Sequence, residues 1–393
     1  MSDLGDLRLS VVTDAADLAG MREAWNEAAA ADPTPNVYLT WEWVHTWWTH
    51  FGEGNELHVL VVRDDDGIVA IAPLQRSRLG VGPLATAVLQ RISPDAGDYG
   101  GIVLVRREAE AVEVLVDHLS GALADRSVAA VVLSRLLGDD PFLALLRTEL
   151  VRRTSSLSAG EATLGGSCLL TDLRADFNMT KQTKKHKIRQ RTRRIGEQHG
   201  EVAFTYHSDG SLDEGLDRLL HVHARRWEGR ESEMQGLLAE REREAFMLDA
   251  IRALDGAGRV RLLTLTADGR PVAAELDFEY QRRMFMFKGA FDPDFGAFSP
   301  GQLLHHRVIE DGLESGLEVV DWGRGDQLYK RRWANGERTQ VTVTVTRSGL
   351  GGRLAAQRLR ATRALERRIR GSGDSSGSPE SAESDSESGS DDS

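Results

Sequence analysis

Two stretches of this chain share one hairpin pattern, and this repeat limits the possible folds more than any other feature. Asp-Gly pairs stand at 66–67 and 268–269, each between two runs rich in Val, Ile, Leu and Ala. An Asp-Gly pair between β-forming runs is a strong signal for a tight turn. Residues 57–74 and 261–278 are therefore each predicted to form a β-hairpin.

The same order of elements follows each hairpin, so the repeat extends over whole domains. Periodicity predicts a strand, a helix and a further strand in each half, at 101–105, 108–123 and 128–133 and again at 284–290, 301–315 and 317–321. The 393 residues are also too many for one ordinary core. We predict an α/β (α+β) fold with two similar domains, residues 1–165 and 166–346, each a mixed sheet flanked by helices.

An aromatic segment, residues 41–48, has helical spacing. Trp41, Val44 and Trp48 fall on one face of such a helix. An aromatic stripe of this kind is more typical of a core than of a ligand site. We therefore predict that this face packs into the first domain.

The C-terminal segment divides into a basic part and an acidic part. Residues 347–370 hold eight arginines and one acid, with leucines near helical spacing, and predict a basic amphipathic helix. Residues 371–393 are rich in serine and hold seven acids, which predicts a disordered tail. The helix is either a solvated face packed on the last domain or a contact for a membrane surface or nucleic acid.

Composition excludes several kinds of site. Cys168 is the single cysteine, so it cannot form an intramolecular disulfide or a multi-cysteine metal site, and we expect a buried thiol. The histidines at 221, 223, 305 and 306 lack the spacing of strong zinc motifs, so no metal ligand is predicted. No apolar run approaches the roughly 20 residues that span a bilayer, and no secretory signal opens the chain. We predict a cytoplasmic protein without a transmembrane segment.

The turn Ser299-Pro-Gly-Gln-Leu-Leu304 is the first candidate site. Serine as a cap and proline in the first turn predict that a helix begins near Pro300. The unpaired N–H groups and the dipole of a helix start attract phosphate. Taken alone, so short a motif more often marks an ordinary capped helix.

A lysine beside a tyrosine marks the second candidate site. Only six of the 49 basic residues are lysine, and one of them follows Tyr329 in the run Asp321-Trp-Gly-Arg-Gly-Asp-Gln-Leu-Tyr-Lys330. Lysine is a compact charge whose pKa shifts readily, unlike that of arginine. In a cleft, Asp321 could accept a proton, Tyr329 could donate one and Lys330 could hold negative charge. The alternative is a turn with exposed charges.

The third candidate is a basic helix, residues 181–194. Eight of its fourteen residues are Lys or Arg and none is acidic. So dense a charge favours an anionic partner, such as a nucleic acid or a nucleotide-linked substrate. The run contains no aromatic residue, which argues against stacking on single-stranded bases.

Several short motifs together resemble the BioF2-like acetyltransferases, a branch of the GNAT superfamily related to the FemAB and CelD proteins. The resemblance covers about residues 7–346. Its motifs are Tyr38-Leu-Thr-Trp-Glu-Trp43, Ile71-Ala-Pro-Leu74, Asp98-Tyr-Gly-Gly-Ile-Val103, the basic helix, Arg225-Arg-Trp227, and the two candidate sites beginning at Ser299 and Asp321.

The resemblance implies tandem GNAT-like domains with the acyl donor in the second. The first half lacks the Ser-Pro-Gly-Gln turn and the Tyr-Lys pair, so it is expected to bind the acceptor or to serve structurally. In GNAT enzymes acyl-CoA lies between splayed strands, and its pyrophosphate rests on the next helix start. The donor contacts implied are Phe287, Lys288, Gly289, Ser299, Gly301, Gln302 and Leu303. The substrate contacts expected are Lys184, Lys185, Arg189 and Trp227.

The predicted activity is N-acyltransfer from acetyl-CoA or another acyl-CoA to an amine of an anionic or envelope-precursor acceptor. Tyr329 matches the GNAT acid that protonates the thiolate, Lys330 matches a charge-neutralising lysine of FemAB proteins, and Asp321 is a candidate base. No permanently bound cofactor is expected. Two alternatives stay open: a transferase that uses aminoacyl-tRNA, and a non-catalytic GNAT-like protein that binds nucleic acid or another anion.

Overall fold

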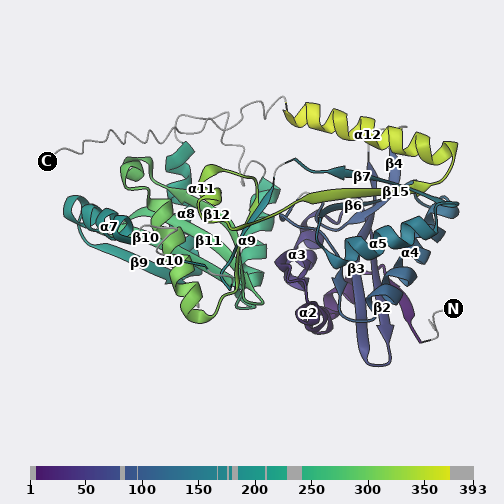
Figure 1. Cartoon of the computed structure of the whole chain (residues 1–393), viewed down its shortest axis with the longest axis horizontal. Coiled ribbons are helices and arrows are strands. Elements are labelled where there is room, and N and C mark those ends of the chain that lie inside the picture. The colour runs from purple at the N-terminus through teal and green to yellow at the C-terminus, as the bar shows by residue number, and fades with distance from the viewer. Residues whose placement is uncertain are drawn as a thin grey trace.

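The computed structural model describes residues 6–79, 85–94, 96–165, 167–174, 177–178, 185–208, 210–227 and 241–371. It shows two lobes side by side, each built on one mixed β-sheet with helices against it (Figure 1). The predicted fold class of tandem α/β units is confirmed. Among the described residues, none of the helices combines the length and the apolar character needed to cross a membrane.

The first sheet is built mainly from the first half of the chain. Its strands lie in the order β1, β2, β3, β4, β6, β15, β7, and β5 pairs with β3. Their bounds are β1 Arg8–Val12, β2 Glu56–Asp64, β3 Gly67–Leu79, β4 Thr86–Arg91, β5 Val103–Leu104, β6 Ala130–Leu137, β7 Leu157–Thr163 and β15 Gln340–Arg347. The helices of this lobe are α1 Ala15–Gly20, α2 Arg22–Ala31, η1 Val37–Leu39, α3 Trp41–Phe51, α4 Glu108–Ala124 and α5 Pro141–Arg152.

The second sheet repeats the plan. Its strand order is β14, β8, β13, β12, β11, β10, β9. The bounds are β8 Cys168–Asp172, β9 Val202–His207, β10 Val260–Ala267, β11 Arg270–Tyr280, β12 Arg283–Phe291, β13 Val319–Arg324 and β14 Gly336–Arg338. The helices are α7 Lys185–His199, α8 Leu212–Trp227, α9 Arg241–Asp255, η3 Pro293–Phe298, α10 Pro300–Ser315 and α11 Leu328–Arg331. Cys168 is buried, as expected.

Both predicted hairpins form, but their turns differ. Asp268 and Gly269 connect β10 to β11, and both have positive φ, which is the geometry of a type I′ turn. In the first hairpin Gly67 instead pairs with Asp64, so the turn residues lie one position earlier than predicted. The Asp64 carboxylate accepts a bond from the Asp66 N–H at 3.0 Å, which holds this turn without glycine at its tip.

Strand β15 crosses from the second half of the sequence into the first sheet. It pairs with β6 on one side and with β7 on the other. The sequence placed all of residues 166–346 in the second unit, whereas residues 340–347 complete the first sheet. The predicted basic helix follows as α12, Leu350–Gly371, and lies along β15 and β6 (Figure 1). The predicted acidic tail lies outside the described residues, apart from Gly371.

Helix α3 packs between the lobes rather than inside the first one. Trp43 and Trp47 are its buried tryptophans, whereas Trp41 and Trp48 of the predicted face are only half-buried. The reason is that α9 of the second lobe covers this side of the helix. The rings of Trp43 and Phe246 are 5.5 Å apart, and Arg259 forms an ion pair with the buried Glu42. One continuous hydrophobic core therefore joins the two lobes.

Candidate functional site

Strands β12 and β13 run parallel and then separate. Their last paired residues are Phe285 and Asp321, although β12 continues to Phe291. Backbone amides along an interior strand point alternately to its two neighbours. Within the described residues, the β12 amides that face β13 beyond Phe285 therefore have no partner strand. The gap between the two strands can admit a ligand and offer it backbone hydrogen bonds.

A β-bulge lies where the gap begins. Leu276 of β11 pairs with Lys288 and Asp277 pairs with Met286, so Phe287 is the extra residue. The Phe287 N–H donates to the Asp277 carboxylate at 3.2 Å. Burial, together with the nearby Glu275, raises the pKa of Asp277 well above its usual value. A bulge bends its strand and re-aims neighbouring groups, and it is common next to active sites.

Helix α10 begins close to the end of β12. It starts at Pro300 as predicted, but the Ser299 side chain makes no capping hydrogen bond. Ser299 has φ 49° and ψ 58°, a left-handed conformation unlike the extended one of a serine cap. The first-turn N–H groups are therefore not covered by this hydroxyl. A Cβ added at Gly301 would meet no atom within 4 Å, so this turn has open space beside its backbone.

Three side chains from three elements meet beside the bulge. His305 of α10 and Glu275 of β11 are buried, with 3.5 Å between Nε2 and Oε2. The ring of Tyr329 from α11 stacks on His305 at 5.6 Å. Partial burial and the Glu275 charge raise the pKa of Tyr329 to about 12. A phenol with so high a pKa keeps its proton at neutral pH and can donate it to a stronger base.

Lys330 points away from solvent toward the boundary of the lobes. Its ammonium donates to the carbonyl oxygen of Arg324, and burial lowers its pKa while Asp98 of the first lobe opposes the shift. Asp98 is so close to the second lobe that a Cβ on Gly323 would lie 2.2 Å from its Oδ2. Burial and the Asp321 charge raise the pKa of Asp98.

Asp321 is buried and engaged on both oxygens. Tyr99 of the first lobe and the Gly323 N–H donate to Oδ1, and Arg283 and Arg338 form ion pairs with Oδ2. Two guanidinium groups and a phenol leave little of this carboxylate for proton transfer. The arrangement ties the end of β13 to the first lobe.

A comparison of sequences identifies this geometry. Residues 182–331, which contain β12, α10, β13 and α11, match the family model described as Acetyltransferase (GNAT) domain. The chain belongs to the GNAT acyltransferases. The acetyltransferase family predicted from the sequence motifs is thereby confirmed. No curated protein matches this GNAT chain at a significant level.

Solved structures share the fold over both lobes. FemX aligns with a TM-score of 0.56 at 13% identity, over 84% of this chain and 96% of its own. The C-terminal domain of a "Putative Lysylphosphatidylglycerol Synthetase" from Agrobacterium fabrum aligns with a TM-score of 0.52 at 14% identity, over 88% and 96%. A protein of unknown function from Bacteroides thetaiotaomicron gives 0.54 at 12%, over 86% and 100%. The FemAB-like arrangement of the GNAT lobes is thus supported by fold.

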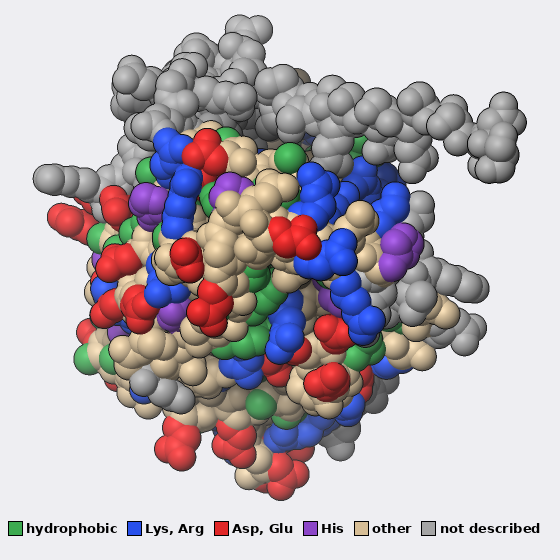
Figure 2. Space-filling model, turned by 90° about the vertical axis from the view of Figure 1, so that its left-hand side faces the viewer, with side chains coloured by type: hydrophobic (Ala, Val, Ile, Leu, Met, Phe, Trp, Pro, Cys, Tyr) green, Lys and Arg blue, Asp and Glu red, His purple; other side chains and the backbone are tan. Residues whose placement is uncertain are grey.

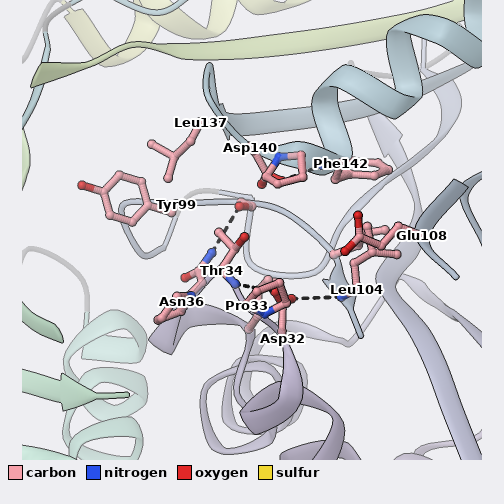
Figure 3. Close-up of a pocket in the computed structure, with 15 residues that line it drawn as sticks. Asp32, Pro33, Thr34, Asn36, Tyr99, Leu104, Glu108, Leu137, Asp140 and Phe142 are labelled. Carbon is pink, nitrogen blue, oxygen red and sulfur yellow. Dashed lines mark hydrogen bonds between the residues drawn. The ribbon is translucent and has the colours of Figure 1, made fainter. Parts of the chain in front are cut away.

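The first GNAT lobe has a corresponding strand pair whose space is filled. Strands β4 and β6 run parallel, and their last printed pair is Gln90 with Val132. The chain around Tyr99 and Gly100 occupies the region beyond, leaving a cavity of about 20 Å³ (Figure 3). Such a volume holds about one water molecule. The cavity therefore has no room for a donor.

Carboxylates line this first-lobe cavity. Asp32, Glu108 and Asp140 border it (Figure 3). Burial raises the pKa of both Asp32 and Asp140 to about 6. Asp32 accepts bonds from the N–H groups of Thr34 and Leu104, and Asp140 caps α5. These acids hold the loops that fill the cavity, and their charges would repel a phosphate.

The other predicted contacts are spread over the second GNAT lobe. Lys288 is half-buried on β12, where burial and Arg226 lower its pKa. Arg189 lies on α7 beside Leu303 of α10. Gly289 lies against Glu275, and Gln302 is in the first turn of α10. Lys184 lies outside the described residues, and Lys185 and Trp227 are described only as the ends of α7 and α8.

Sequence reasoning overlooked Glu275 and His305. A signal for Glu275 existed, because two acids interrupt the otherwise apolar strand of residues 272–278. Acids in a buried strand need a partner or a function. His305 was set aside because only metal binding was considered for it. Its position one helical turn after Gly301 places it on the side of α10 that faces β11.

Proposed function

We propose that this chain is an N-acyltransferase that holds its acyl donor in the gap between β12 and β13. The observation that carries the proposal is the early end of the parallel pairing at Phe285 and Asp321, with a bulge on one side and an open helix start near it. In this arrangement β12 amides bind the thioester carbonyl. The first turn of α10, from Ser299 to Leu303, binds the phosphates of the donor.

The proposed reaction moves the acyl group from sulfur to nitrogen. The amine lone pair attacks the thioester carbonyl carbon, and the C–S bond then breaks with its electron pair on sulfur. Tyr329 gives its proton to the thiolate, and Glu275 takes the proton that the new amide nitrogen loses, directly or through water. Lys330 stabilises negative charge during transfer. Asp321 as the base stays a prediction; because its oxygens are engaged, we assign it to positioning β13.

Acyl-CoA is the proposed donor, and an aminoacyl-tRNA is the second candidate. The open turn at Gly301 suits a pyrophosphate. The basic helix α7 is the specific observation in favour of RNA. The synthetase with a similar fold is named for a lysyl-lipid product, which fits transfer of an aminoacyl group. The acceptor is proposed to be an amine on an anionic or envelope-precursor molecule, and the location to be cytoplasmic.

Calorimetry followed by a turnover screen tests the proposal. The full chain is titrated with acetyl-CoA, and a panel of amines is then screened for release of the CoA thiol. We expect binding and turnover, and we expect Tyr329→Phe to lower kcat by about 100-fold with little change in acetyl-CoA binding. A Tyr329→Phe variant with full turnover would remove the assigned acid.

The same titrations separate the alternatives. Binding and turnover with charged tRNA but not with acetyl-CoA would favour the second donor. Salt-dependent binding of duplex DNA without turnover on either donor would indicate the non-catalytic protein instead.

A further inference from the structure

A groove lies between helices α7 and α10, on the second lobe and apart from the β12–β13 gap. It has a volume of about 450 Å³, within the range of small-molecule sites. One wall is α7, the other is α10, and Phe204 of β9 lies between them. Figure 2 looks onto this end of the molecule, where groups of Lys and Arg side chains surround exposed hydrophobic ones.

The groove combines positive charge with an apolar lining. Its cationic side chains are Arg189, Arg193 and Arg307, and its apolar ones are Ile188, Phe204 and Leu303. Arg193 and Arg307 each have an acidic neighbour one turn along their helix, at 3.3 Å and 2.7 Å. Among the described residues Arg189 has no ion-pair partner.

The position of Arg189 is set by the packing of α7. Thr192 and Arg193 share its side of the helix, whereas Ile195 is buried and Arg194 stacks over Phe298 at 5.5 Å. The helix is therefore fixed against η3 and presents Arg189 to the groove. A fixed guanidinium with no internal partner is suited to a phosphate.

The groove reaches the helix start that we assign to the donor phosphates. Leu303, which lines it, is in the first turn of α10, and His306 and Arg307 follow one turn later. Negative charge is favoured near a helix start, and an aromatic ring such as Phe204 can pack against a heterocyclic base. Phosphate and base together form a nucleoside phosphate.

We propose that the α7–α10 groove binds a nucleoside phosphate, with Arg189 contacting the phosphate and Phe204 the base. Both donors under consideration carry this chemistry, as the 3′-phosphoadenosine of CoA and as the 3′ end of a tRNA. The inference rests on the proposed function only for the identity of the ligand. The binding itself needs no turnover.

A pair of arginine variants on one helix tests the groove. Arg189→Ala removes a groove residue, and Arg191→Ala removes the same charge two residues away, outside the groove lining. The full-length proteins are titrated with CoA, dephospho-CoA, 3′,5′-ADP and an RNA oligonucleotide ending in CCA. We expect Arg189→Ala to weaken binding of at least one probe about tenfold or more, and Arg191→Ala to change it less than twofold.

The probes distinguish the two sources of the ligand. Loss of affinity for CoA and 3′,5′-ADP, with dephospho-CoA unaffected, identifies the 3′-phosphate of CoA. Loss confined to the oligonucleotide identifies RNA. Equal losses in both variants, no loss in either, or a wild-type chain that binds none of the probes would overturn the proposal. If the groove binds but no amine is acylated, the proposed function fails and the groove assignment stands.

Discussion

The two lobes contain the same parallel strand pair, and only one of them leaves the space beyond it open. In the first lobe, the chain around Tyr99 fills the region past β4 and β6, and a cavity for about one water remains. In the second lobe, β12 continues past its last pair with β13, carries a bulge, and approaches an open helix start. The comparison teaches that the connection after the fourth strand, rather than the sheet, decides which lobe can hold a ligand.

Charge follows the same division. Asp32, Glu108 and Asp140 line the space in the first lobe, whereas Lys288 and Lys330 flank the gap in the second. Burial raises the pKa of the acids and lowers that of the lysines, so both lobes contain charged groups that are costly to bury. The first lobe engages its acids in loop hydrogen bonds. We propose that the second keeps its cations for a ligand.

The largest expected effect tests the cation of the second lobe. Lys330→Met keeps the length of the side chain and removes its charge. Acyl transfer to the acceptor found in the amine screen should fall about 100- to 1000-fold in kcat, because one preorganised charge near the reacting group is lost. Stopped-flow thiol release measures it. Glu108→Gln in the first-lobe cavity is the control, and equal activity losses in both variants would erase the distinction between the lobes.

The second prediction concerns stability and the acids of the first lobe. Because the folded-state pKa of Asp32 is about 6, above its usual value, the folded protein holds a proton that the unfolded chain has lost. The stability of the wild type relative to Asp32→Asn should therefore fall as pH rises from 4 to 6, by at most about 3 kcal/mol. Urea unfolding at several pH values measures it. A difference that rises over this interval would contradict the assignment.

The third prediction tests how closely the bulge region is packed. In Gly289→Ala the added Cβ would lie 2.2 Å from Oε2 of Glu275, so the carboxylate must move. We expect a loss of about 1–3 kcal/mol in the free energy of unfolding and a lower kcat. Thermal unfolding and turnover are measured together. Unchanged kcat in a destabilised variant would remove Glu275 from the reaction.

The smallest expected effect compares two helical glycines, one in each lobe. Gly301 begins α10 and Gly121 lies in α4, and a Cβ at either would meet nothing within 4 Å. Alanine at either position should be neutral or stabilise the helix by up to about 1 kcal/mol. Only Gly301→Ala should raise the KM for acetyl-CoA, several-fold, because its methyl group would occupy the space assigned to phosphate. Equal KM values for the two variants would move the phosphates elsewhere.

Local patterns predicted the paired hairpins and the helices α4 and α10, because turn residues and apolar periodicity determine such elements directly. The sequence missed β4, a short strand of residues 86–91 beside a stretch outside the described residues. It also chose the wrong side of α3, since the ring that buries Trp43 comes from Phe246 of the other lobe. Likewise, Glu275, His305 and Tyr329 meet only through tertiary packing, and no spacing along the chain predicts that meeting.

The return of β15 to the first sheet has a consequence for how the protein is made. Strand β7 pairs only with β15 among the described strands, and β6 would otherwise be an exposed edge. During synthesis the first lobe must therefore wait for residues 340–347, after nearly all of the second lobe has been translated. A gene cut between the two halves would yield two incomplete pieces, and any lineage that kept the catalytic half would have had to keep its filled partner as well.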